Sequence, residues 1–160
     1  MKIILYHGTD SLFEDIDLTK SKERRDFGVG FYTTTISSQA EGWARSKKKR
    51  NHSLNAYVYV YEAHISDSLS VCEYLNMSLE WLKMIKTNRE LGGIQHNYDI
   101  VIGPVANDDT MLTVSRYIAG VYTANEAIER LKYSKANNQV SFHTNNAIKA
   151  LKFIRRYKVD

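Results

Sequence analysis

The residues from Asp26 to Thr34 bring two glycines and a tyrosine together in one short stretch. Gly28 and Gly30 can adopt backbone angles that are closed to other residues, and they let a ligand approach the backbone closely. Tyr32 follows in a run of aromatic residues and threonines that favours an extended strand. This arrangement would present the Tyr32 ring beside exposed backbone N–H groups. The alternative is a hairpin turn followed by a buried aromatic side chain.

Two other groups of residues could contribute to a site, although they lie far away in the sequence. A strand predicted near the N-terminus ends in His7, Gly8 and Thr9. Gln139 and Ser141 share one face of an alternating segment late in the chain. Each group alone is weak evidence, because a histidine at a strand end is usually hydrogen-bonded within the protein and a strand glutamine usually faces solvent.

Motifs for several other chemistries are absent. Gly28 and Gly30 lack the third glycine of a dinucleotide-binding loop, and Asp26-Phe27-Gly28 lacks the catalytic loop that accompanies this triplet in kinases. The five histidines and the single cysteine show no metal-ligand spacing, so we expect no metal site. A ribonuclease would need a histidine or carboxylate pair poised for acid–base catalysis, and no spacing indicates one.

The composition is that of a mildly basic globular protein. The chain has 160 residues, a net charge of +4 and a pI near 9.1. This balance permits an anionic partner such as a nucleotide, nucleic acid or an acidic protein, without requiring one. The single cysteine, Cys72, cannot form an internal disulfide and fits a reducing cytoplasm. No apolar run reaches the length of a membrane span, so we expect a cytoplasmic protein with no membrane partner.

Hydrophobic periodicity predicts an α+β protein that folds as one domain over residues 1–160. Strands are predicted over residues 3–6, 56–63, 98–105 and 139–143, and in the stretch after Gly30. Helices are predicted over residues 38–50 and 78–88, and after residues 107–109, Thr123 and Thr144. The predicted helix caps are Ser78 and the capping boxes Ser38–Glu41 and Thr123–Glu126.

Three further segments carry expectations about structure. The last predicted helix would bury Ala147, Ile148, Leu151 and Ile154 along one face. The basic segment Lys20–Arg25 is predicted to be a mobile, solvated loop, and Lys47–Arg50 a solvated helix end that complements the helix dipole. Both basic segments could approach nucleic acid electrostatically, or serve only solubility.

Several blocks of the sequence, read in order, resemble a bacterial family of unknown function that is placed in the ADP-ribosyltransferase superfamily. The blocks are Leu5-Tyr6-His7-Gly8-Thr9, Asp26-Phe27-Gly28-x-Gly30-Phe31-Tyr32-x-Thr34, Gln39-Ala40-x-x-Trp43-Ala44, Tyr98-Asp99-Ile100-Val101-x-Gly103-Pro104-Val105-Ala106-Asn107-Asp108 and Gln139-Val140-Ser141-Phe142-x-Thr144. The resemblance spans nearly the whole chain. It implies a split β-sheet core with flanking helices, with NAD⁺ held as substrate in the cleft between two small sheets.

The resemblance also implies roles for individual residues. His7 would hold the adenosine ribose, Tyr32 would stack on the nicotinamide ring, and Gln139 would take a third catalytic position that is usually a glutamate. The backbone of Gly8 would bind the nicotinamide amide. The remaining candidates for NAD⁺ binding are Thr9, Gly30, Asn107 and Asp108.

The departure at Gln139 matters because cleavage of the nicotinamide–ribose bond builds positive charge on the ribose. A site therefore needs an acceptor near the ribose hydroxyls. Gln139 brings a carbonyl dipole but no negative charge. A carboxylate could come instead from Asp108 or Asp109, whose alternative role is to cap the helix that follows.

The resemblance implies an enzyme that transfers ADP-ribose from NAD⁺ to a macromolecular acceptor, either a protein or a nucleic acid. A toxin–antitoxin system, with a small antitoxin protein that neutralises the enzyme, is the context it suggests. The missing glutamate leaves open a catalytically silent module that binds NAD⁺, ADP-ribose or a partner protein. A ribonuclease toxin is the third hypothesis, based on the histidines and the basic segments.

Overall fold

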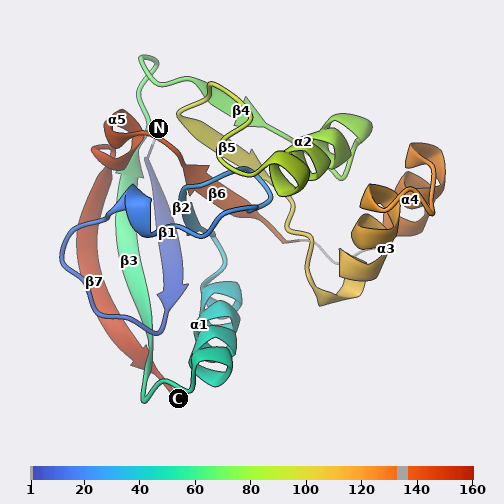
Figure 1. Cartoon of the computed structure of the whole chain (residues 1–160). Helices are drawn as coiled ribbons and strands as arrows, with labels where there is room; N and C mark the ends of the chain where they lie inside the picture. Colours follow the sequence, from blue (N-terminus) through green and yellow to red (C-terminus); the bar gives the residue numbers. More distant parts are fainter. Residues whose placement is uncertain (1, 133–136) are drawn as a thin grey trace.

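A computed structural model describes residues 2–132 and 137–160, without the side chains of residues 108 and 109. In these residues the fold is α+β, with five α-helices and two β-sheets of three and four strands (Figure 1). The strands are β1 (Lys2–Thr9), β2 (Phe31–Thr33), β3 (Ala56–His64), β4 (Val71–Glu73), β5 (Ile100–Gly103), β6 (Gln139–Phe142) and β7 (Leu151–Val159). The helices are α1 (Ser37–Asn51), α2 (Leu79–Leu91), α3 (Asp108–Ile118), α4 (Ala124–Leu131) and α5 (Asn145–Ile148), with one 3₁₀ turn, η1 (Leu18–Lys20).

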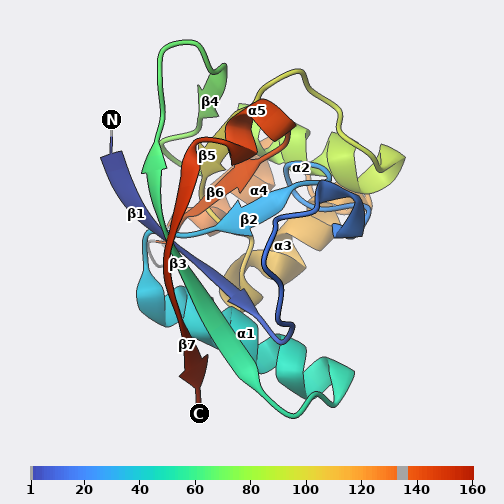
Figure 2. The ribbon, with the colours of Figure 1, turned by 90° about the vertical axis from the view of Figure 1, so that its left-hand side faces the viewer.

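The first sheet has the strand order β1-β3-β7, and both pairings are antiparallel. Valines and tyrosines alternate along β3, so they face opposite sides of the sheet. Val58 and Val60 pack with Ala40 and Ala44 of α1, which lies alongside β1 and β3 (Figure 2). Tyr59 and Tyr61 belong to the core cluster on the opposite face of the sheet.

The second sheet has the strand order β2-β6-β5-β4. Its β4 and β5 run parallel and are connected through α2, whereas the other neighbours are antiparallel. A core cluster beside this sheet contains Trp81, Leu82 and Ile85 of α2, all fully buried. The two sheets meet where the backbones of Tyr6 and Thr34 exchange two hydrogen bonds of 2.8 and 2.9 Å.

The predicted C-terminal helix is wrong beyond Ile148. Thr144 does cap a helix, because its hydroxyl accepts from the Ala147 N–H, but α5 is only one turn long. Residues 151–159 form β7, which pairs with β3 along its whole length (Figure 1). The spacing of the apolar residues is compatible with a helix. The edge of β3, however, supplies hydrogen-bond partners for the backbone of residues 151–159, and no local pattern in the sequence reveals these partners. The short strand β4 was also not predicted.

The helix caps were predicted with mixed success. The Ser78 cap of α2 and the Thr123–Glu126 capping box of α4 are confirmed. The Ser38–Glu41 capping box is wrong, because α1 begins one residue earlier and follows Ile36, which makes no side-chain cap. The first strand also extends further than predicted, so that His7, Gly8 and Thr9 lie inside β1 and pair with β3.

Candidate functional site

A cleft of about 770 Å³ lies between the two sheets and the segment that connects β1 to β2. Its walls include residues of β1, β2, β6 and α1, together with single residues of α2 and α3. The cleft brings together five of the predicted site residues: His7, Thr9, Gly30, Tyr32 and Gln139. They come from both sheets and are far apart in the sequence.

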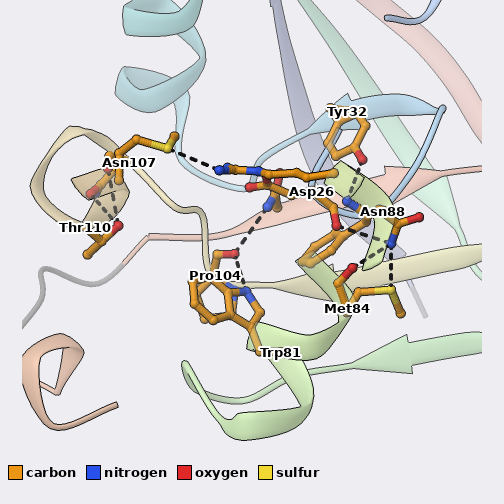
Figure 3. A network of polar contacts seen from close by, with 12 residues as sticks. Asp26, Tyr32, Trp81, Met84, Asn88, Pro104, Asn107 and Thr110 are labelled. Atoms are coloured by element: carbon orange, nitrogen blue, oxygen red, sulfur yellow. Dashed lines mark hydrogen bonds and ion pairs between the residues drawn. The ribbon is translucent and has the colours of Figure 1, made fainter. Parts of the chain in front are cut away.

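Two other predicted site residues are placed differently. Gly8 and Asn107 do not line the cleft. Gly8 is buried against α1, since a Cβ at this position would lie 2.0 Å from the carbonyl oxygen of Ala40. Asn107 precedes α3, where its backbone carbonyl and side chain accept from Thr110 (Figure 3). The side chains of Asp108 and Asp109 lie outside the described part of the molecule.

The His7 ring is held neutral at the centre of the cleft. Its Nδ1 donates to the backbone carbonyl of Tyr32 over 2.7 Å, and the ring stacks on Phe31 with centroids 4.0 Å apart. Burial, together with the nearby positive charges of Lys47 and Arg25, lowers the pKa of His7 from 6.5 to about 3. Because Nδ1 carries the proton, Nε2 is an uncharged hydrogen-bond acceptor at neutral pH.

The Tyr32 side chain fixes the glycine turn that precedes it. Its hydroxyl accepts from the Phe27 N–H over 2.9 Å (Figure 3). It also donates to the Gly28 carbonyl over 2.6 Å. The residue is only 4% exposed, and burial raises the pKa of the hydroxyl above its usual value. The guanidinium of Arg25 lies 4.2 Å from the ring centroid, so it covers one face of the ring. The interpretation of Tyr32 as a buried aromatic after a turn is therefore confirmed, although the ring also lines the cleft.

Gly28 and Gly30 are required by local geometry. Gly28 has a φ of +94°, which glycine adopts without strain. A Cβ on Gly30 would lie 2.7 Å from Nδ1 of His143, which donates to the Val29 carbonyl over 2.8 Å. On its other side, Nε2 of His143 lies 2.7 Å from the Ser141 hydroxyl. Ser141, predicted to share the site, is fully buried and supports this histidine.

His143 should make the protein less stable in acid. Burial and the neighbouring His96 lower the pKa of His143 from 6.5 to about 4. The unfolded chain gains a proton near pH 6.5 and the folded chain does not, so this group's stabilisation is lost as the pH falls from 6.5 towards 4. We expect a loss of about 2 kcal/mol by pH 4.5 from His143. Urea unfolding at pH 7 and at pH 4.5 measures this difference in the free energy of unfolding.

The matched comparison for this prediction uses two substitutions. His143→Asn keeps an amide N–H near the position of Nδ1, as a donor for the Val29 carbonyl, but cannot titrate, so its stability should depend less on pH than that of the wild type. His52→Asn alters an exposed histidine at the left-handed end of α1, where asparagine is tolerated, and should keep the wild-type pH dependence. If the free energy of unfolding fell equally with decreasing pH in all three proteins, the assignment of the effect to His143 would be contradicted.

Gln139 is held by its amide group at the wall of the cleft. The residue is 4% exposed, and its Nε2 donates to the Pro104 carbonyl over 3.2 Å. The indole N–H of Trp81 donates to the same carbonyl over 2.9 Å (Figure 3). The amide nitrogen is thus engaged with the protein, whereas the side-chain oxygen has no hydrogen-bond donor among the described residues.

An ion pair closes the side of the cleft near α2. Arg89 contacts the Asp26 carboxylate through Nε at 2.7 Å and through a terminal nitrogen at 2.5 Å. The two side chains are only 20% and 14% exposed, so the pair is partly shielded from water. Arg89 also reaches the sulfur of Met111 at 3.4 Å, which links α2 to α3 (Figure 3). Asp26 is therefore bound to a cation rather than available as a metal ligand.

The segment Lys20–Arg25 is largely exposed, as predicted for a solvated loop, but it is anchored over the cleft, whereas a mobile loop was expected. Ser21 accepts from the Gly30 N–H over 3.0 Å, and Arg24 donates to the Arg89 and Glu90 carbonyls. Arg24 also has a φ of +62°, a conformation that is unfavourable for an arginine and is held by these contacts. The charge pattern of the segment predicts its exposure, whereas its long-range carbonyl partners on α2 cannot be read from the sequence.

Lys47 was missed as a site residue, because it was assigned to a solvated helix end. Its Nζ donates to the Gly8 carbonyl over 2.9 Å, and burial and Arg25 lower its pKa to about 8. The α1 residues that line the cleft are three or four positions apart, so they share one helix face. This spacing could have indicated that Lys47 belongs to the site. These residues are Trp43, Ser46, Lys47, Arg50 and Asn51, all on one helix face.

Two searches over the described residues, 2–132 and 137–160, bear on other kinds of site. They contain no group of three or more His, Cys, Asp or Glu side chains that could hold a metal ion. None of their helices combines the length and the apolar character needed to cross a membrane.

Comparison with known proteins identifies the family. No curated protein and no solved structure gives a significant match to the chain. A family model described as "Protein of unknown function (DUF3990)" matches residues 3–153, which is nearly the whole chain. The chain therefore belongs to the DUF3990 family.

Proposed function

We propose that this protein binds NAD⁺ in the cleft and transfers its ADP-ribose group to a macromolecular acceptor, as an ADP-ribosyltransferase-like enzyme with a split-sheet core. The observation that carries the proposal is the convergence of His7, Tyr32 and Gln139 on one cleft. His7 belongs to the first sheet, and the other two residues belong to adjacent strands of the second. A cavity of about 770 Å³ is within the usual range for the binding site of an organic ligand.

The polar groups of the cleft suit a reaction that builds positive charge on a ribose. Transfer breaks the bond between the ribose C1 and the nicotinamide nitrogen, whose electron pair leaves with nicotinamide, and the acceptor forms the new bond to C1 and loses a proton. Nε2 of neutral His7 can accept from a ribose hydroxyl. The free side-chain oxygen of Gln139 directs the negative end of its dipole at the developing charge.

Stacking of nicotinamide on Tyr32 requires Arg25 to leave the ring face that it covers. A cation–π contact of this kind contributes about 0.5–2 kcal/mol. Stacking of a nicotinamide ring on the same face replaces that contact. The energy required to move Arg25 is therefore small enough for ligand binding to supply.

A second candidate function is a module that binds NAD⁺ or ADP-ribose without turnover. The observation that favours it is the state of Gln139, which is uncharged and tied to the Pro104 carbonyl. Without a negative charge beside the ribose, binding could occur while bond cleavage remains slow.

NAD⁺ binding decides whether the cleft is a dinucleotide site. We expect calorimetric titration to detect binding by the wild type, and His7→Ala to weaken it about 10-fold or more, because the substitution removes both an acceptor and part of the stacked wall. His64→Ala changes an exposed histidine at the end of β3, outside the cleft, and should bind NAD⁺ as the wild type does.

Nicotinamide release then separates the two candidates. Release, with transfer of labelled ADP-ribose to a protein or nucleic acid in a lysate, supports the transferase. Bound NAD⁺ that stays intact on long incubation supports the binding module. If the wild type does not bind NAD⁺ at high protein concentration, or if both His7→Ala and Tyr32→Ala fold and bind it unchanged, the proposal fails for both candidates.

A further inference from the structure

The cleft carries an excess of positive charge that the protein does not neutralise. Its walls hold seven basic and four acidic side chains. Three of the acids already have partners within the protein: Asp26 pairs with Arg89, Asp10 accepts from Asn51 and Ser53, and Asp17 accepts from Thr19. A cleft lined by one sign of charge concentrates ions of the opposite sign.

Six of the seven basic residues form no ion pair among the described residues, and Arg89 is the exception. Arg25, Lys47 and Arg50 are three of these six. Lys47 and Arg50 lie one turn apart on the face of α1 that lines the cleft, whereas Arg25 comes from the segment between β1 and β2 and lies over Tyr32. Lys47 and Arg25 both lower the pKa of His7, so both charges act at the centre of the cleft.

Lys47 retains donors for a ligand. An ammonium group has three N–H donors, and only one hydrogen bond of Lys47 is made with the described residues, to the Gly8 carbonyl. That bond holds the ammonium at the end of β1, in the same cleft as His7 and partly shielded from bulk solvent. Even partial burial of a lysine without a carboxylate partner is unfavourable, because it desolvates an unpaired charge.

We propose that Lys47, Arg25 and Arg50 form a subsite for the diphosphate group of a nucleotide. Cations from two separate segments that line the cleft suit a group with two linked phosphates, and guanidinium groups bind phosphate oxygens in pairs. The rings of His7, Tyr32 and Trp43 line the same cleft and provide surfaces for the groups on either side of the diphosphate. This inference rests on the proposed function only for the choice of NAD⁺ as one probe.

The subsite should lose affinity in alkaline solution. Burial is the largest cause of the lowered pKa of Lys47, followed by Arg25, and Arg50 and Lys22 lower it further, whereas Asp10 raises it. With a pKa of about 8, Lys47 is mostly charged at pH 7 and neutral at pH 9.5. Affinity for ADP should therefore fall over this range in the wild type, and the fall should be smaller in Lys47→Met.

Calorimetric titrations with ADP, NAD⁺ and inorganic pyrophosphate test the subsite. We expect Lys47→Met to weaken ADP binding about 10-fold or more, since a charge-assisted hydrogen bond to phosphate is lost. Arg50→Gln should weaken it about 5-fold, and it removes a side chain that forms no ion pair among the described residues. Lys48→Met alters a neighbouring lysine outside the cleft and should change affinity less than 2-fold.

The outcomes separate this inference from the proposed function. ADP binding that depends on Lys47 and Arg50, without NAD⁺ binding, would support the subsite and overturn the proposed function. NAD⁺ binding that is unchanged in both variants would overturn the subsite and leave the proposed function standing. No binding of ADP, pyrophosphate or NAD⁺ would overturn the subsite, as would tighter binding of single-stranded RNA than of ADP. If Lys47→Met fails to fold, Arg50→Gln decides.

Discussion

Gln139→Glu should raise the rate of NAD⁺ cleavage about 100-fold. A carboxylate cannot donate to the Pro104 carbonyl and is repelled by it, so it should turn from the wall towards the cleft. There it would place a full negative charge beside the ribose, and a single well-placed polar group contributes about 10²–10³ in rate in comparable sites. Release of nicotinamide from labelled NAD⁺, measured over hours, gives the rate.

The control for this prediction is Gln39→Glu. Gln39 of α1 also donates its amide to a backbone carbonyl, that of Asn138 over 2.6 Å, but it does not line the cleft. Both substitutions replace a bound amide by a carboxylate, and each should cost about 1–3 kcal/mol of stability. Only Gln139→Glu should gain activity. A folded, NAD⁺-binding Gln139→Glu protein without faster cleavage would remove Gln139 from the reaction.

Gly8→Ala should destabilise the protein by about 3 kcal/mol, which is near the upper end for an added core methyl group. The new Cβ would lie 2.0 Å from the carbonyl oxygen of Ala40 and 3.0 Å from the backbone nitrogen of Ala44. Both atoms belong to the backbone of α1, so no side-chain rotation relieves the contact and the whole helix must move away from β1. Thermal unfolding should show a melting temperature about 10 °C lower.

Gly42→Ala is the matched control, because it adds the same methyl group to α1 itself. A Cβ on Gly42 has no other atom within 4 Å. Alanine is the better helix former, so this variant should be stabilised by about 0.5–1 kcal/mol. A Gly8→Ala protein as stable as the wild type would show that α1 does not rest on β1 as closely as the structure places it.

The sequence by itself determined most of the local structure. Alternation of valine and tyrosine in β3, the Ser78 cap and the Thr123–Glu126 box all depend on neighbours within a few residues, and the structure confirms them. The α+β class follows from these elements. The resemblance also selected His7, Tyr32 and Gln139, which meet at one cleft although no local pattern joins them.

Tertiary structure decided which of two local possibilities each ambiguous segment adopts. Residues 151–159 have apolar side chains that fit a helix or a strand, and the free edge of β3 selects the strand because it satisfies their backbone groups. Ser38 could have capped a helix, but the chain reaches α1 through Ile36 and leaves that hydroxyl out of the cap.

Tertiary structure alone also decided the electrostatics of the cleft. The sequence shows Arg25 and Lys47 as members of basic runs, and such runs are usually solvated. Folding places Arg25 on the Tyr32 ring and Lys47 on the Gly8 carbonyl, and burial then lowers the pKa values of Lys47 and His7. Desolvation and through-space charge depend on distances between residues far apart in the chain, so they exist only once the two sheets and α1 have come together.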